Sequence, residues 1–510
     1  MGYEVIFVKW MNMVPVTKKR LRFPVAIFLV ALCLRLIPVL ALRTLGIGLD
    51  DMFQYDMLAR SLASGDGYRW YAQEDLPLIT SYIHLDVDPA TYDPRGVLTS
   101  FRPPLYPAFL ALIYAIVGMG GGRFFVARLV QTILGASLAP LAYALGRRLF
   151  PDEVRIATIA SWGVALYPML VIYPLSLATE NLFFVLMLSS ILALVIAWQT
   201  LTDSVPGSPR SRIGVLFQDR WFILTGILFG LMALTRSVSL ALVGVAVLWI
   251  WFVARARRQA IVLAAVVAAL TLPWMLRNTF LHQHLTGIES ALGYDLYVGY
   301  HPQGTGTFQY PQSLDLMTMI DDGERDELGR EKAWEFISAD PWRFPYLILR
   351  RAGYFFGLER RAMTYFYSNN FFGYIPQPVL FLLSGVLCVP FVLISLSSVP
   401  GMLFVERKRE KILVLVLLAC YMVPHLLIIA EDRFHLALVP FLALFAASFW
   451  VEGRTRMGEA IDARHRYWLL GIALVLVSLL LATWGLELSR DADKLRLLFG
   501  PSGNLTYFPY

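Results

Sequence analysis

Two adjacent carboxylates, Asp50 and Asp51, follow the first long apolar segment, where the chain is expected to leave a membrane. Ionisable residues at membrane depth are costly and usually mark a functional site. A carboxylate there can take the proton of a hydroxyl group that comes within hydrogen-bond reach. A charged loop start exposed to water explains the pair equally well, and the spacing alone does not separate the two interpretations.

A short helix is expected directly after the acidic pair. Its apolar residues recur at helical spacing and form one face: Tyr55, Leu58, Ala59 and Leu62. The other face carries Asp56 and Arg60, and Gly65 is a typical helix end. The pattern predicts a helix that lies along the membrane surface behind the two acids.

Composition places these residues in a membrane protein. The 510 residues are 57% hydrophobic and only 16% charged, whereas soluble domains are about half apolar and about a quarter charged. The excess falls in long blocks, which is typical of a polytopic membrane protein. The net charge of +7 does not indicate nucleic acid, because Lys and Arg cluster in short loops between apolar blocks, as membrane orientation requires.

Other classes of site find no support in the sequence. Cys33, Cys388 and Cys420 lie inside apolar segments, so we expect neither a disulfide framework nor a metal site from them. No nucleotide-binding glycine motif is present. The first apolar block lacks a small-residue cleavage site, so we expect it to remain as a helix.

The apolar blocks predict an all-α bundle of about 11–12 transmembrane helices, with an extracytoplasmic catalytic loop and a larger mixed extracytoplasmic region. The predicted divisions are a cytoplasmic N-terminus at 1–22, an N-terminal membrane module at 23–276 with outer loop 45–101, an extracytoplasmic region at 277–375, C-terminal membrane helices at 376–486, and an extracytoplasmic tail at 487–510. In the extracytoplasmic region we expect a charged helix over 325–338 and an interfacial helix over 345–356.

Sidedness brings the scattered charges together. When the basic loops are placed inside, one outer face receives Asp50, Asp51, Arg102, Glu180, Arg236, Arg277 and Arg433. The cost is that segment 104–118 is too short to span, because a span needs about twenty residues; it must be partial or re-entrant, or one basic cluster breaks the rule. Each arginine alone is more often a snorkelling interface residue, but the set indicates a reaction site.

At these residues the chain resembles the polytopic glycosyltransferases that use lipid-phosphate sugars. That group includes protein O-mannosyltransferases, the aminoarabinose transferase acting on lipid A, and bacterial transferases of lipopolysaccharide cores. The matching motifs follow one order along the chain: Asp50-Asp51 with Leu62-Ala-Ser-Gly-Asp66, Arg102-Pro-Pro-Leu-Tyr-Pro107, Ala178-Thr-Glu180-Asn-Leu-Phe, Leu234-Thr-Arg236, Pro273-Trp274-Met-Leu-Arg277-Asn278 and Asp432-Arg433-Phe-His-Leu. Asp51 stands where Glu is common, and Asn181 where Pro is common, which blurs the subfamily.

The resemblance implies a GT-C fold and transfer of a sugar from polyprenyl phosphate to an extracytoplasmic lipid, polysaccharide or protein, with inversion at the anomeric carbon. It implies Asp50 as the base, with Asp51 and Glu180 as the other catalytic acids. Arg102, with Arg236 and Arg433, is expected to bind the donor phosphate. No metal and no other cofactor is expected, although related oligosaccharyltransferases place a divalent metal between such acids.

The region around the substrate is expected to include Tyr55, Arg277, Tyr297, Tyr300 and His301. Aromatic residues from Tyr294 to Tyr310 suit a lid over a sugar, and a plain interfacial belt of aromatics explains them nearly as well.

A transporter or flippase of a lipid-linked or anionic substrate is the competing interpretation, because it also places charges at membrane depth. Against it, the sequence contains no internal repeat and no matched pair of interrupted helices. A wall or O-antigen ligase would not predict the Arg-Pro-Pro and Thr-Glu motifs. The expected location is the cell membrane, with the active site on the extracytoplasmic face and no nucleic-acid partner.

Overall fold

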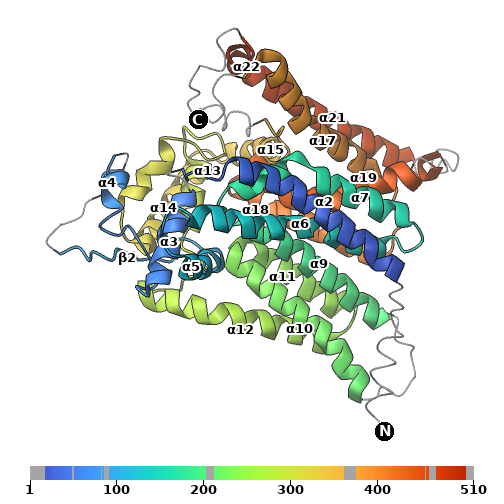
Figure 1. Ribbon diagram of the computed structural model, residues 1–510, viewed down its shortest axis with the longest axis horizontal. Helices are drawn as coiled ribbons and strands as arrows, with labels where there is room; N and C mark the ends of the chain where they lie inside the picture. Colours follow the sequence, from blue (N-terminus) through green and yellow to red (C-terminus); the bar gives the residue numbers. More distant parts are fainter. Residues whose placement is uncertain are drawn as a thin grey trace.

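The chain folds into a bundle of long helices with a smaller helical layer at one end (Figure 1). The computed structural model describes residues 18–48, 51–81, 83–85, 91–202, 212–360, 375–453, 455–458 and 467–500. The long helices of the bundle are α2 (Lys18–Ala41), α6 (Arg123–Leu149), α7 (Val154–Leu166), α9 (Glu180–Thr202), α10 (Arg212–Thr235), α12 (Arg257–His282), α17 (Gln377–Leu403), α18 (Arg409–Leu427) and α21 (Tyr467–Arg490).

Shorter elements complete the bundle. They are α5 (Leu105–Val117), α8 (Pro168–Ile172) with η1 (Tyr173–Leu175), η2 (Ser237–Ser239) with α11 (Leu240–Leu248) and η3 (Trp249–Val253), η5 (Asp432–Leu438) with α19 (Val439–Ser448) and η6 (Phe449–Gly453), and α22 (Ala492–Leu498). Pro168 separates α7 from α8, where the chain bends by 54°, because proline lacks the N–H that would continue the helix.

The all-α polytopic class predicted from composition is confirmed. Within the described ranges, eight helices are long and apolar enough to cross a membrane, or nine if the bent pair from Val154 to Leu175 is one span. The predicted total of about 11–12 is larger because it includes α10 and the stretch Ser237–Val253, beside segment 104–118, which is expected to be partial or re-entrant. Helix α5 and Ser237–Val253 are shorter apolar helices, and α10 carries Asp219 and Arg220 within its length.

The segment after Pro104 forms a helix that is too short to cross a membrane, as its sequence predicts. Helix α5 has 13 residues and therefore extends about 20 Å, well below the roughly 30 Å of a hydrocarbon core. It ends at Gly118, whose φ of 83° is left-handed; glycine adopts this conformation at little cost. Helix α6 begins at Arg123 after the three glycines from Gly120 to Gly122.

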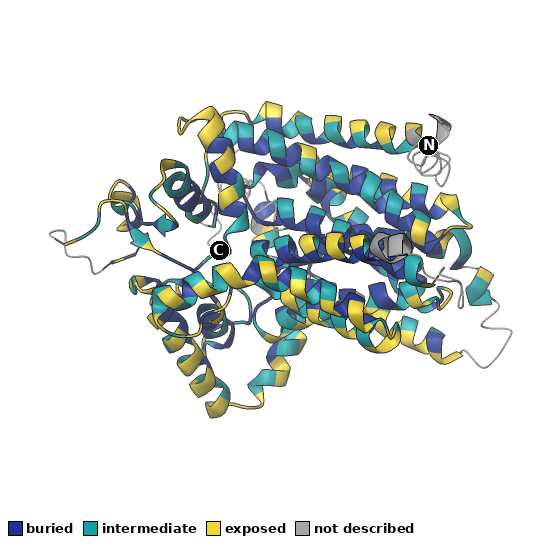
Figure 2. Ribbon diagram, turned by 90° about the horizontal axis from the view of Figure 1, so that it is seen from below, coloured by how far each residue is buried: buried dark blue, intermediate teal, exposed yellow. Residues whose placement is uncertain are grey.

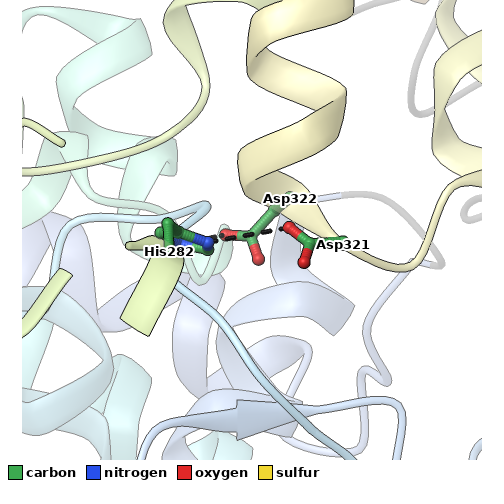
Figure 3. Close-up of side chains that lie close together, drawn as sticks. All are labelled: His282, Asp321 and Asp322. Atoms are coloured by element: carbon green, nitrogen blue, oxygen red, sulfur yellow. Dashed lines mark ion pairs between the residues drawn. The ribbon is translucent and has the colours of Figure 1, made fainter. Parts of the chain in front are cut away.

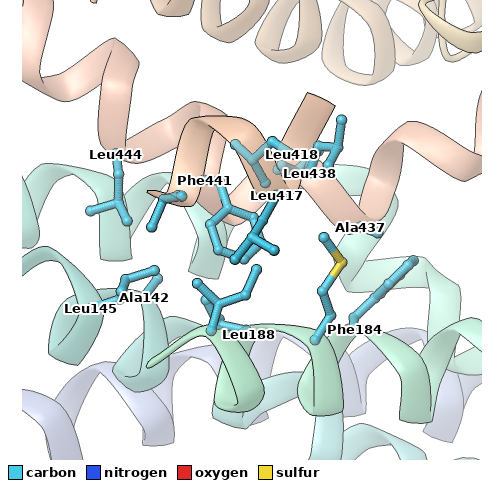
Figure 4. Close-up of a cluster of buried hydrophobic side chains, with 14 of the residues drawn as sticks. Ala142, Leu145, Phe184, Leu188, Leu417, Leu418, Ala437, Leu438, Phe441 and Leu444 are labelled. Carbon is cyan, nitrogen blue, oxygen red and sulfur yellow. The ribbon is translucent and has the colours of Figure 1, made fainter. Parts of the chain in front are cut away.

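The centre of the bundle is the span formed by η5, α19 and η6. In its most apolar window 83% of the residues are buried, against 17% for α21 at the periphery. Figure 4 shows this span packed against three other helices through Ala142 and Leu145 of α6, Phe184 and Leu188 of α9, and Leu417 and Leu418 of α18. Exposed residues lie along the outer helices (Figure 2), as expected for faces that contact lipid.

A second layer caps one end of the bundle (Figure 1). Its elements come from two distant stretches: α3 (Asp51–Ser64), β1 (Arg69–Trp70), α4 (Leu76–Ile79) and β2 (Val97–Leu98), then α13 (Leu292–Tyr300), η4 (Gln312–Thr318), α14 (Asp322–Ala339) and α15 (Arg343–Phe355). The two short strands pair antiparallel, with Arg69 opposite Leu98. Helices α14 and α15 form where helices are predicted at 325–338 and 345–356, with slightly different ends; the interfacial position of the second helix stays a prediction.

Arg351 of α15 ties this layer to the bundle. Its guanidinium is fully buried and donates to the carbonyls of Gly299 (2.7 Å), Gly306 (3.3 Å) and Leu427 (2.8 Å). Leu427 is the last residue of α18, whose final carbonyls have no partner within their own helix. A single cation therefore joins the end of one bundle helix to two segments of the outer layer.

Helix α3 forms where the sequence predicted it, but its polar face does not lie against water. Asp56 is only 1% exposed. It accepts hydrogen bonds from Arg60 (2.9 Å), from Arg123 at the start of α6 (2.9 Å) and from the hydroxyl of Tyr114 in α5 (2.9 Å). The expected solvent-facing charge is therefore a buried anchor, because α5 and α6 pack over the side of α3 assigned to solvent.

The basic ends of α6, α12 and α18 lie at the end of the bundle opposite the capping layer. Because basic loops stay in the cytoplasm, the capping layer is predicted to lie outside. We expect a cysteine at position 285, where Leu285 is 86% exposed, to react with a membrane-impermeant maleimide from outside intact cells. A cysteine at Arg407, in the exposed 406–407 turn, should react only after permeabilisation. Both are placed in a background lacking Cys33, Cys388 and Cys420. Equal labelling from one side would contradict the topology.

Candidate active site

A cavity of about 380 Å³ lies where the capping layer meets the helix ends. Its walls contain five acids, three arginines and several aromatic side chains: Asp51, Glu180, Glu289, Asp295, Glu431, Arg102, Arg236, Arg433, Tyr55, Tyr294, Phe308 and Phe434. Asp51 begins α3, Glu180 begins α9, Arg236 follows α10, and Arg433 lies in η5. The cavity is thus assembled from the ends of helices that are far apart in the sequence.

The charges at the floor of the cavity alternate in sign along one continuous chain. Arg102 donates to Asp51 (2.5 Å), and the other oxygen of Asp51 accepts from Arg433 (3.1 Å). The Nε of Arg433 lies 3.8 Å from Glu180, which pairs with Arg236 at 2.7 Å. We call these five residues, Arg102, Asp51, Arg433, Glu180 and Arg236, the charge chain. Pairing of this kind is what allows charges to be held away from water.

The flanks of the charge chain hold its arginines in place. Arg102 also donates to the side-chain oxygen of Gln54 (2.8 Å), one turn into α3. The guanidinium of Arg236 lies 4.9 Å from the ring centre of Phe434, in reach of a cation–π interaction. Glu431 pairs with Arg433 at 2.7 Å. An arginine has five N–H donors, so these contacts leave each guanidinium with donors for a ligand.

The environment of Asp51 makes it a poor proton acceptor. Burial alone would raise the pKa of this carboxyl, but the charges of Arg102 and Arg433 outweigh burial and lower the pKa to about 2. A general base works best with a pKa near the operating pH. Asp51 is therefore placed to hold two arginines, and its implied role as a catalytic acid stays a prediction. The predicted base itself, Asp50, lies outside the described residues.

The residues expected around the substrate are divided by the structure. Tyr55 lines the cavity, and burial raises the pKa of its hydroxyl to about 12. The other four residues do not line the cavity and contact other parts of the protein instead. Arg277 donates to the carbonyl of Thr99 (2.6 Å), Tyr297 donates to Asp315 (3.0 Å), Tyr300 donates to the carbonyl of Leu427 (2.6 Å), and Arg343 donates to the carbonyl of His301 (2.7 Å).

Of the aromatic residues from Tyr294 to Tyr310 that are expected to form a lid, two line the cavity, Tyr294 and Phe308. The hydroxyl of Tyr294 donates to the carbonyl of Ser313 (2.8 Å). Tyr310 is 62% exposed. Helix α13 presents one turn to the cavity and the next to the rest of the layer, which the spacing of the tyrosines alone did not indicate.

Sequence reasoning missed two cavity acids, Glu289 and Asp295. They belong to the long outer region, where no apolar periodicity assigns a side chain to a face. One signal was present: the fifteen residues from Thr286 to Tyr300 contain these two acids and neither Lys nor Arg. Glu431, two residues before Arg433, is a further cavity acid.

A second polar cluster lies behind the cavity, formed by His282 at the end of α12 and by Asp321 and Asp322 at the start of α14 (Figure 3). Among the described residues this is the one group of His, Cys, Asp or Glu spaced to hold a metal ion. Its atoms are largely engaged in hydrogen bonds. Asp321 caps α14 by accepting from the N–H of Gly323 and Glu324, and His282 Nε2 lies 2.7 Å from Ser100 Oγ.

Asp322 is the centre of this hydrogen-bonded cluster. One of its oxygens accepts from the N–H of Ser100 (2.7 Å), the hydroxyl of Ser290 (2.6 Å) and the hydroxyl of Thr99 (3.1 Å). Its other oxygen is buried without a hydrogen-bond partner among the described residues. Ser100 precedes Arg102 by two positions, and Ser290 follows Glu289. Asp322 therefore joins the two loops that carry these cavity residues.

The comparisons with known proteins agree with the motifs. Residues 101–207 match the family described as dolichyl-phosphate-mannose-protein mannosyltransferase. This segment includes Arg102 and Glu180 of the charge chain. The resemblance to polytopic lipid-phosphate-sugar glycosyltransferases is thereby confirmed, and glycosyl transfer is the general class of activity it supports. No curated protein sequence matches the chain.

Several solved structures are similar at low identity. The oligosaccharyltransferase of Archaeoglobus fulgidus in the apo form aligns with a TM-score of 0.47 and 15% identity, over 96% of this chain and 60% of that chain. The same archaeal enzyme, AglB, in complex with an inhibitory peptide and a dolichol-phosphate gives 0.46 and 14%, over 96% and 60%. ArnT from Cupriavidus metallidurans bound to undecaprenyl phosphate gives 0.36 and 14%, over 86% and 78%. The chain spans about 60% of the length of the oligosaccharyltransferase.

The Asp322 cluster predicts a stability effect. Asp322→Ala removes the acceptor of three donors, one of them a backbone N–H that cannot turn away, and a buried unpaired donor costs about 1–3 kcal/mol. We expect a lower melting temperature than in the matched variant Asp321→Ala, which loses a helix cap worth about 1 kcal/mol. Because the ligand atoms already accept hydrogen bonds, a chelator should leave the wild-type melting temperature unchanged. A chelator effect as large as that of Asp322→Ala would show that the cluster holds an ion.

Proposed function

We propose that this protein transfers a sugar from a polyprenyl-phosphate donor to an acceptor hydroxyl on the extracytoplasmic face of the cell membrane, with inversion at the anomeric carbon. The acceptor is an envelope lipid, polysaccharide or protein. The observation that carries the proposal is the charge chain: three arginines with donors to spare converge on one cavity at the end of the bundle covered by the capping layer. The family match over residues 101–207 supports the same class of reaction.

The arginines suit the leaving group. As the bond between the anomeric carbon and the phosphate oxygen breaks, negative charge grows on the polyprenyl phosphate, and planar guanidinium groups stabilise such charge through paired N–H donors. Arg102, Arg236 and Arg433 line one cavity. Because Asp51 and Glu180 hold them in position before the donor arrives, little reorganisation is required during the reaction, which is the basis of electrostatic catalysis.

The acids have separate roles in the proposed step. Asp50 takes the proton of the acceptor hydroxyl while the oxygen attacks the anomeric carbon from the side opposite the phosphate. Asp51 orients Arg102 and Arg433, and Glu180 orients Arg236. Since the cavity carboxylates at the floor are already paired with arginines, we propose that the transfer needs neither a resident metal nor another cofactor.

Two variants separate the proposed roles. Asp50→Asn removes only the proton acceptor, so we expect turnover to fall by about 10²–10⁴-fold with donor affinity nearly unchanged. Arg102→Ala removes a contact made both to the bound donor and to the leaving group, so both donor affinity and turnover should fall, each by roughly ten- to hundredfold. The measurements are donor binding and single-turnover transfer in nanodiscs, with polyprenyl phosphates of several hexoses and pentoses.

Arg95→Ala is the matched control, because Arg95 belongs to the same outer loop but pairs with Asp93 and is half exposed. It should leave both quantities unchanged. Normal turnover of Asp50→Asn would remove Asp50 as the base. Failure to transfer from any donor, together with movement of a lipid-linked sugar across a vesicle membrane, would instead support a flippase.

A further inference from the structure

Two carboxylates of the cavity stand outside the charge chain. Glu289, in the loop between α12 and α13, accepts a hydrogen bond from the hydroxyl of Ser237. Asp295, in the first turns of α13, has no hydrogen-bond donor and no ion-pair partner for its carboxylate within the ranges that the structure describes. Both side chains line the cavity, so both face the space that a donor would occupy.

The surroundings of Asp295 are charged on every side. The nearest groups that influence it are Glu289 in the neighbouring loop, Arg102 before α5, Asp51 at the start of α3 and Arg236 after α10. The charge of Asp326 in α14 contributes to raising the pKa of Glu289. Glu180, Glu431, Arg433 and His425 line the remaining wall. Tight packing fixes the direction of α13, because Gly293 lies so close to α14 that a Cβ would meet the carbonyl of Asp326 at 1.8 Å.

Burial raises the pKa of Asp295 to about 7, and the negative charge of Glu289 contributes to the rise against the opposing effect of Arg102. Burial also raises the pKa of Glu289, although the hydrogen bond from Ser237 opposes it. Asp51, in the same cavity, has its pKa lowered to about 2 by its two arginines. The difference follows from pairing: the acids of the charge chain have cations, and this pair has none.

Binding of an anionic donor adds to the excess of negative charge in the cavity. The cavity wall contains three arginines and five acids, so with every acid ionised the arginines are already outnumbered before a phosphate enters. A buried charge without a partner is strongly destabilising, and a carboxyl group usually escapes this cost by taking a proton. Asp295 is the cavity acid with the least to lose on protonation, because within the described ranges no arginine pairs with it and, unlike Glu289, it accepts no hydrogen bond.

We propose that Asp295, which lines the same cavity as Glu289, takes up one proton from solvent when the lipid-phosphate donor binds, and then donates a hydrogen bond to the donor as a neutral carboxylic acid. This inference rests on the proposed function. The step is a simple protonation: a solvent proton adds to a carboxylate oxygen of Asp295, and no other bond changes. Its role is to let one cavity hold both an acid-rich wall and an anionic ligand.

Because donor binding is coupled to proton uptake, the direction in which pH changes the donor affinity can be worked out. With a pKa of about 7 in the free protein, Asp295 is mostly protonated at pH 6, so donor binding there takes up almost no proton and the affinity changes little with pH. Above pH 7 the free protein must gain a proton to bind, so the affinity falls by up to about tenfold for each pH unit. Between pH 6.5 and pH 8.5 the expected loss of affinity is roughly twentyfold.

The test measures binding of a polyprenyl methyl phosphate, a phosphodiester whose single negative charge does not titrate in this range. Calorimetry of the full chain in nanodiscs, in two buffers of different ionisation enthalpy, gives the affinity and the number of protons taken up. Wild type should take up close to one proton at pH 8.5 and almost none at pH 6. Asp295→Asn and Asp295→Ala should both abolish the uptake and the pH dependence, and Asp295→Asn should bind at pH 8.5 at least as tightly as wild type.

Asp315→Asn is the matched control, because Asp315 is an exposed acid of the same outer layer; it should retain the wild-type pH dependence. The inference is overturned if wild-type affinity does not change with pH, or if both Asp295 variants keep the change. Loss of binding in Asp295→Asn at every pH would also overturn it, because the ionised form would then be the one required. If the phosphodiester binds wild type and Arg102→Ala equally weakly at all pH values, the proposed function fails instead.

Discussion

The charge chain is the interaction on which the rest of this structure depends. Five ionisable groups lie together where the capping layer meets the helix ends, away from water, and they are tolerated because each has neighbours of the opposite sign. Breaking one link leaves a buried charge without its partner. The ends of α3, α9, α10 and η5 must therefore meet at one point, and this requirement fixes the arrangement of the helices that carry them.

The remainder of the fold serves to hold those ends in register. The span of η5, α19 and η6 passes through the centre of the bundle, packed against α6, α9 and α18, so Arg433 at its outer end has little freedom. The capping layer is held from two sides: Arg351 binds carbonyls at the end of α18, and Asp322 joins the loops beside Arg102 and Glu289. Hydrogen bonds from several segments to one buried polar group specify one arrangement in a way that apolar packing alone does not.

The cavity also combines two kinds of acid, and the difference lies entirely in what surrounds them. Asp51 and Glu180 are paired with arginines and act as fixed anions. Glu289 and Asp295 lie across the same space without cations, so burial favours their neutral forms. Asp51 and Glu180 thus keep their negative charge, whereas Glu289 and Asp295 are suited to gain or lose a proton. The surroundings of each group produce this difference between chemically similar side chains.

The sequence by itself determined the membrane class, the helical bundle, helix α3, helix α14 and the meeting of Asp51, Arg102, Glu180, Arg236 and Arg433 on one side. Apolar block length predicts the membrane class and the bundle, helical spacing of apolar residues predicts α3, and the sidedness of basic loops places the five charged residues on one face; all of these are signals read along the chain. Asp50 was also predicted from the sequence but lies outside the described residues. The burial of Asp56, the place of Tyr297, Tyr300 and His301 away from the cavity, and the arrival of Glu289 and Asp295 in its wall were decided only by the tertiary structure. Around residues 286–300 the spacing of apolar residues does not assign Glu289 and Asp295 to a face, so the direction of a side chain there depends on contacts between distant segments, such as that of Ser290 with Ser100, which local spacing cannot encode.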